Sequence, residues 1–139
     1  MIPDQAFKQL NHNYKGYSIY LKGNSIEPGY KPDFVLKNND EYIILESENS
    51  SSRKTFVGGL IKAAHFLQKE RKGMLIFVIV PKSNTKAKSI ANHLKIYLKW
   101  VQSISNLQQV YVIEASLYYQ NDILLSIDGN DFIKNAFKV

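Results

Sequence analysis

The chain has 139 residues, 45% of them hydrophobic, and a net charge of +6 at neutral pH. This length suits a single domain over residues 1–139, and the apolar content supports a core, which excludes global disorder. Because the chain has no cysteine, disulfides, thiolate nucleophiles and cysteine-based zinc sites are excluded. The first ten residues do not resemble a signal peptide, and the longest apolar run, residues 74–80, is too short to cross a bilayer. We therefore expect a cytoplasmic protein with no membrane partner.

The charge is spread unevenly along the chain. Residues 1–50 contain five Lys and seven acidic residues, whereas residues 51–110 contain eleven Lys or Arg and a single acid, Glu70. Segregated charge of this kind favours a polyanionic partner such as nucleic acid. A lysine-rich surface that serves solubility alone would have the same composition.

The first half of the chain predicts a short helix and three strands. Residues 4–13 suit a helix, and residues 17–22 suit a strand that ends at Gly23-Asn24. Residues 33–37 and 41–48 predict two strands of a hairpin, joined through residues 38–40 with the sequence Asn-Asn-Asp.

A helix is expected after the hairpin. Ser51 or Ser52 can cap it, and Gly73 is expected to end it. Its buried stripe repeats at helical spacing and comprises Phe56, Leu60, Ala63, Ala64 and Leu67. Its last turn would contain cations that suit the helix dipole, namely Lys69, Arg71 and Lys72.

The second half predicts a buried strand over residues 74–80, a helix over 84–104 and a strand over 109–115. A final short helix is expected over 131–137, and residues 117–127 can hold one more strand. The apolar face of the long helix comprises Ile90, Leu94, Tyr97, Leu98, Val101 and Ile104. This order of elements predicts an α/β fold with a mixed β-sheet flanked by helices.

Acidic residues gather at the end of the predicted hairpin. Side chains alternate along a strand, so Glu46 and Glu48 share one face. A two-residue turn at Asn39-Asp40 places Asp33 directly opposite Glu46, and a turn at Asn38-Asn39 leaves the two acids diagonal. Only an odd-length turn separates them. Opposed carboxylates destabilise a sheet unless a cation lies between them.

These carboxylates predict a metal site. Oxygen-only ligands select hard cations, so we expect Mg²⁺ or Mn²⁺, which can activate water and neutralise a phosphate. In the alternative interpretation, Asp33 only caps a strand, and Glu46 and Glu48 pair with lysines of the next helix.

Pro32-Asp33, twelve intervening residues and then Glu46-Ser47-Glu48, followed by a helix and a buried strand, resemble the PD-(D/E)XK nuclease superfamily. The resemblance implies a restriction-endonuclease-like core in which Asp33, Glu46 and the Ser47 carbonyl hold metal. Position 48 departs from the usual Lys, although a minority branch of restriction enzymes has Glu-x-Glu. Glu48 can act only as an acceptor or general base. The missing positive charge would come from Lys62 on the next helix or from a second metal, unless Lys62 is merely a solvated surface residue.

The chain offers further candidates for contacts with DNA. Phosphate contacts are expected from the cations that open the two long helices, namely Arg53, Lys54, Lys86 and Lys88. Gly58-Gly59 inside the first helix indicates close helix-to-sheet packing or, less directly, room for a DNA backbone. Glu27 is either an outlying fourth acid or a surface residue. The three histidines, His12, His65 and His93, lack metal-ligand spacing and are interpreted as structural or surface residues.

Together these features predict a Mg²⁺- or Mn²⁺-dependent DNA endonuclease, either restriction-type or specific for branched DNA. Cutting both strands needs two sites, so a homodimer or a partner subunit is expected. Two alternatives stay open. One is a catalytically inactive nuclease-like DNA-binding module, and the other is a protein-interaction domain whose lysines serve solubility only.

Overall fold

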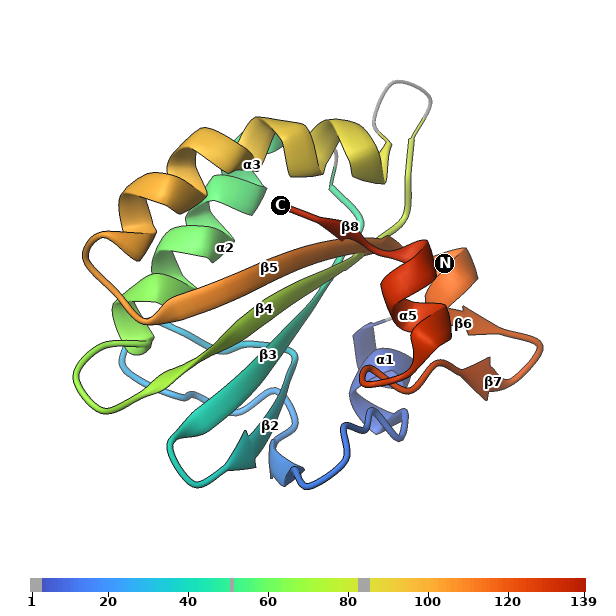
Figure 1. Cartoon of the computed structure of the whole chain (residues 1–139). Helices are drawn as coiled ribbons and strands as arrows, with labels where there is room; N and C mark the ends of the chain where they lie inside the picture. Colours follow the sequence, from blue (N-terminus) through green and yellow to red (C-terminus); the bar gives the residue numbers. More distant parts are fainter. Residues whose placement is uncertain (1–3, 51, 83–85) are drawn as a thin grey trace.

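The computed structural model describes residues 4–50, 52–82 and 86–139. Its centre is a six-stranded mixed sheet in the order β1-β2-β3-β4-β5-β8 (Figure 1). Strands β1 to β3 are antiparallel, β3 to β5 are parallel, and β8 lies antiparallel to β5. The strands are β1 (Ser18–Leu21), β2 (Phe34–Asn38), β3 (Glu41–Glu48), β4 (Lys72–Ile79), β5 (Leu107–Glu114) and β8 (Phe137–Lys138).

Helices cover both faces of this sheet (Figure 1), which confirms the predicted α/β class. The two long helices, α2 (Arg53–Phe66) and α3 (Ala87–Gln102), connect the parallel strands and pack on one face. The other face is covered by α1 (Asp4–Gln9), α4 (Ala115–Tyr118) and α5 (Asn130–Asn135). A small hairpin, β6 (Tyr119–Gln120) with β7 (Ile123–Leu124), lies in the segment where one more strand was expected. No helix within the described ranges is long and apolar enough to span a membrane.

The core has two layers because β4 is buried on both faces, as predicted. Leu75 and Phe77 pack toward α2 and α3, whereas Ile76 and Val78 pack toward the opposite face. The predicted stripe of α2 is likewise buried. Along α3 the prediction is wrong at two positions, because Tyr97 is 36% exposed and Ile104, beyond the helix end, is 58% exposed.

His12 is a buried residue packed against the second layer, so of the two alternatives considered from the sequence, structural or surface, it is structural. Its Nε2 lies 2.7 Å from the Phe7 carbonyl oxygen and its Nδ1 lies 2.6 Å from the Tyr118 hydroxyl. A carbonyl can only accept, so Nε2 carries the proton and Nδ1 accepts from Tyr118. Burial lowers the pKa of His12 to about 4, so the ring is neutral at neutral pH.

The predicted end of α2 is wrong. The helix ends at Phe66, and the Arg71 side chain donates a hydrogen bond from Nε to the Phe66 carbonyl at 2.7 Å. Lys69 then adopts a positive φ of 60°, which turns the chain toward β4. Gly73 lies inside β4, where a Cβ atom would overlap the Tyr42 carbonyl of β3. This glycine therefore permits close approach of two strands and does not end a helix.

Several predicted boundaries also differ from the structure. Ser52 occupies the N-cap position of α2, but its side chain makes no capping hydrogen bond, and Ser51 lies outside the described residues. Helix α1 is shorter than predicted. Helix α5 ends at Asn135, and the last residue of its predicted range, Phe137, belongs to β8.

Candidate functional site

The hairpin register brings Asp33 and Glu46 together. Asn38 pairs with Glu41 and Phe34 pairs with Leu45, so the turn consists of the two residues between β2 and β3. Asn39 in this turn has a positive φ of 53°. One step beyond Phe34, Asp33 faces Glu46, which confirms the first of the registers considered from the sequence.

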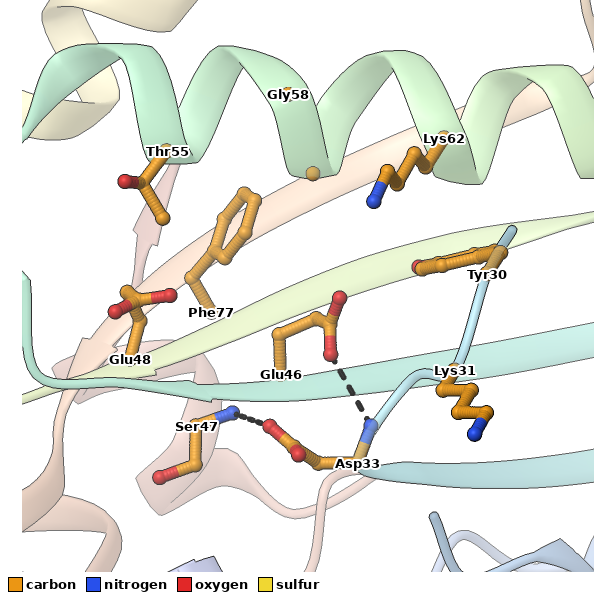
Figure 2. A pocket seen from close by; sticks show the side chains of 11 residues that line it. Tyr30, Lys31, Asp33, Glu46, Ser47, Glu48, Thr55, Gly58, Lys62 and Phe77 are labelled. Carbon is orange, nitrogen blue, oxygen red and sulfur yellow. Dashed lines mark hydrogen bonds between the residues drawn. The ribbon is translucent and has the colours of Figure 1, made fainter. Parts of the chain in front are cut away.

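Two hydrogen bonds fix this acid pair to the hairpin (Figure 2). The Asp33 amide donates to Glu46 Oε1 at 3.1 Å, and the Ser47 amide donates to Asp33 Oδ2 at 2.8 Å. Each carboxylate is therefore held by a backbone N–H group of the opposite strand. Parallel pairing of Glu46 and Ser47 with β4 supports the other side of β3. The acids are thus placed by the central part of the fold and not by a free loop.

A cavity of about 340 Å³ opens between these acids and helix α2 (Figure 2). The sheet contributes carboxylates to it, and α2 contributes a hydroxyl, two glycines and an ammonium group. The lining residues are Tyr30, Lys31, Asp33, Glu46, Ser47, Glu48, Thr55, Gly58, Gly59, Lys62 and Phe77. Every residue predicted to be catalytic or to bind metal therefore borders one cavity.

Glu46 has the most perturbed carboxylate of this cavity. Burial is the largest cause, followed by repulsion from Asp33, and together they raise its pKa from 4.5 to about 7. Glu48 adds further repulsion, while the hydrogen bond from the Asp33 amide opposes the shift. A cation in the cavity would relieve this repulsion, so the residues fit a divalent metal in charge and in donor chemistry.

Glu48 lies apart from the other two carboxylates (Figure 2). Its Oε1 accepts a hydrogen bond from the Ser50 amide at 2.9 Å, which turns it toward the end of the strand. Within residues 4–50, 52–82 and 86–139, no three His, Cys, Asp or Glu side chains converge closely enough to enclose a metal. Asp33 and Glu46 are therefore the metal pair to consider, with Glu48 beside them.

Lys62 is exposed on α2, and its ammonium group points into the cavity from above the acids (Figure 2). The alternative that Glu46 and Glu48 pair with lysines of this helix is not supported. The ion pairs found among the described residues are Glu27–His65 and Glu41–Lys72.

The predicted DNA-contacting residues lie outside the cavity but at the same edge of the sheet. Arg53 opens α2 and Lys86 precedes α3, and these helices follow the carboxyl ends of the parallel strands β3 and β4. Lys54, Lys86 and Lys88 are exposed. Arg53 is half-buried, and its Nη1 is enclosed without a hydrogen-bond partner among the described residues.

Tyr30 also belongs to the site, although it was not among the residues predicted from the sequence. Its ring is buried, and its hydroxyl borders the cavity without a hydrogen bond of normal geometry to any described residue. Burial, then the nearby Glu46 carboxylate, raise the pKa of this hydroxyl well above its usual value. The only sequence signal was an aromatic residue shortly before Pro32-Asp33 in a segment interpreted as a loop.

Glu27 is not part of the cavity lining. Its Oε2 lies 2.8 Å from His65 Nδ1 on α2, so it attaches the loop that carries Tyr30 to that helix. The surface interpretation of Glu27 is therefore the better one, with a structural role added.

No protein-family model matches the chain, and no curated protein matches it. Among solved structures, the chain is similar to Pyrococcus furiosus SfsA in complex with Ca²⁺, with 14% sequence identity and a TM-score of 0.39. The match covers 72% of this chain and 49% of SfsA, so the chain spans about half the length of that protein. A likeness of this extent assigns neither a fold family nor a function.

Proposed function

We propose that the chain is a divalent-metal-dependent nuclease of the PD-(D/E)XK kind that hydrolyses phosphodiester bonds in DNA. The observation that carries the proposal is the acid pair, Asp33 directly before β2 and Glu46 on β3, which faces Lys62 across one cavity. Paired carboxylates under a cationic side chain suit a reaction in which a phosphate must be bound and its charge offset.

Asp33 and Glu46 would hold the metal, with the Ser47 carbonyl as a further oxygen ligand. Such a donor set favours Mg²⁺ or Mn²⁺ over zinc. When bound, the cation would polarise the scissile phosphodiester and offset its negative charge. The raised pKa of Glu46 supports this assignment, because burial and the nearby Asp33 carboxylate disfavour its charged form, which a bound cation would favour.

Glu48 and Lys62 would divide the tasks that one lysine performs in the usual motif. Glu48 is an acceptor and would take the proton of the attacking water as a general base. Lys62 would place positive charge near the phosphate oxygens from the opposite wall of the cavity. A water molecule must reach Glu48, which is half-buried and lines the cavity.

Arg53, Lys54, Lys86 and Lys88 would contact the DNA backbone near the cavity. Contacts of this kind position the nucleic acid and do not read its sequence. A homodimer or a partner subunit would supply the second site for double-strand cleavage. Restriction-type cleavage and cleavage of branched DNA are both compatible with this arrangement.

A second candidate, a DNA-binding module without catalysis, is favoured by one observation. The Glu48 carboxylate is bound to the Ser50 amide and no lysine occupies its position. If the module has lost its metal, Mn²⁺ should produce no heat in calorimetry, whereas the nuclease should bind Mn²⁺ and lose it in Glu46→Ala.

Cleavage of linear, supercoiled and branched DNA with Mg²⁺ or Mn²⁺ tests the main proposal. We expect wild-type cleavage, and its loss in Asp33→Ala and Glu46→Ala with DNA binding retained. Glu41→Gln is the matched control, because Glu41 lies on the same strand outside the cavity and pairs with Lys72. A wild-type protein inert on all three substrates with both metals would refute catalysis.

A further inference from the structure

Tyr30 has a buried hydroxyl group that the packing of the protein alone does not explain. The residue is 3% exposed, and its ring belongs to the core layer beneath α2 and α3. Its hydroxyl has no hydrogen-bond partner of normal geometry within the described part of the chain. Burying an unsatisfied hydroxyl is unfavourable, and phenylalanine would fill the same space without that cost. We therefore expect the hydroxyl to have a role in the cavity that it borders.

The loop around Tyr30 is built to hold this side chain in place. The Ile26 amide donates to the Tyr30 carbonyl at 3.0 Å, and the Tyr30 amide donates to the Glu27 carbonyl at 3.0 Å. Glu27 in turn pairs with His65 on α2 at 2.8 Å. The backbone amide and carbonyl of Tyr30 are thus both hydrogen-bonded, and the loop is attached to α2, which lies over the cavity.

The hydroxyl is directed toward the carboxylate of Glu46 (Figure 2). One oxygen of that carboxylate, Oε1, accepts from the Asp33 amide. The other oxygen of the carboxylate lies on the side of Tyr30 (Figure 2). A tyrosine hydroxyl keeps its proton at neutral pH, so it is available as a donor.

We propose that Tyr30 is a positioning residue, whose hydroxyl donates a hydrogen bond to the ionised Glu46 carboxylate and holds it facing the cavity when a divalent cation is bound. The proposal rests on the proposed function for the identity of the ligand. Tyr30 would not touch the substrate. It would act on the metal through Glu46, in the way that hydrogen-bonded neighbours orient metal ligands elsewhere.

The test is Tyr30→Phe, measured by Mn²⁺ calorimetry and by thermal unfolding without metal. We expect Mn²⁺ affinity to fall by roughly 10- to 100-fold, the range for partners that orient a ligand. The unfolding temperature should stay unchanged or rise, because an unpaired buried hydroxyl is removed. Tyr42→Phe is the matched control, since Tyr42 is a buried tyrosine of the same core layer that does not line the cavity. It should leave Mn²⁺ affinity unchanged.

The possible failures are distinguishable. If wild-type protein binds Mn²⁺, Glu46→Gln does not, and Tyr30→Phe binds as tightly as wild type, the role of Tyr30 is overturned while the metal site stands. If wild-type protein binds no Mn²⁺, both the proposed function and the role of Tyr30 are refuted. An unfolding temperature lowered more than in the control would mean that the hydroxyl has a purely structural partner, which also overturns the proposal.

Discussion

Glu46 should make the stability of the metal-free protein depend on pH. Its pKa rises from 4.5 to about 7 on folding, first through burial and then through repulsion from Asp33. An acid with a raised folded-state pKa stabilises the fold fully below its unfolded pKa, and this contribution is lost as pH rises through the folded pKa. The contribution of Glu46 to stability is therefore lost between pH 4.5 and about 7. At about 1.4 kcal/mol per pKa unit, this lowers the free energy of unfolding by about 3 kcal/mol.

His12 acts in the opposite direction and would conceal this effect in the wild-type protein. Its pKa falls from 6.5 to about 4 on folding because the ring is buried. A base with a lowered folded-state pKa stabilises the fold above its unfolded pKa, and this contribution is lost as pH falls toward 4. Because the two shifts are similar in size, the contributions of Glu46 and His12 largely cancel between about pH 4.5 and 6.5.

Glu46→Gln isolates the effect of the carboxylate. The amide keeps an acceptor for the Asp33 N–H group but cannot ionise. The difference in the free energy of unfolding, variant minus wild type, should therefore increase by about 3 kcal/mol between pH 4.5 and 8. Urea denaturation at several pH values in the presence of a chelator measures this difference. A difference between the two proteins that does not vary with pH would show that Glu46 titrates normally, and the argument from burial would be refuted.

Two further predictions concern stability. Gly73→Ala should lower the free energy of unfolding by at least about 2 kcal/mol, because the new Cβ would overlap the Tyr42 carbonyl, whereas Gly58→Ala, with no neighbour within 4 Å, should raise it by up to about 1 kcal/mol. Equal effects in urea titrations would contradict this account of the two glycines. Tyr118→Phe should cost about 1–3 kcal/mol, because it leaves the buried Nδ1 atom of His12 without its donor. Unchanged stability in the same assay would mean that this hydrogen bond contributes nothing.

The position of the acid pair could be predicted because it depends on local rules. Strand alternation sets the face of Glu46 and Glu48, and the length of the hairpin turn sets the residue opposite Glu46. Both rules act over a few residues, so two of the three turns considered from the sequence place Asp33 on the face of Glu46, and the structure has the turn at Asn39-Asp40. The cavity also requires α2 to lie over this end of β3; the sequence predicted the helix but not its position over the acids.

The errors arose where distant contacts decide the structure. Helix α2 ends early because Arg71 binds the Phe66 carbonyl and the chain must turn into β4, and neither event is visible in helical periodicity. Gly73 resembled a helix terminator, but its neighbour is Tyr42, far away in sequence. Tyr30 was missed for the same reason, since its place beside Glu46 depends on a loop attached through Glu27 and His65.

The crossed hydrogen bonds between Asp33, Glu46 and the Ser47 amide have a consequence for how ligand binding can be observed. These bonds close the open end of the hairpin through side-chain oxygens. A ligand that draws either carboxylate away must release an amide at Asp33 or Ser47. Amide hydrogen exchange at these two positions would therefore report occupancy of the cavity directly, even for a ligand that undergoes no reaction.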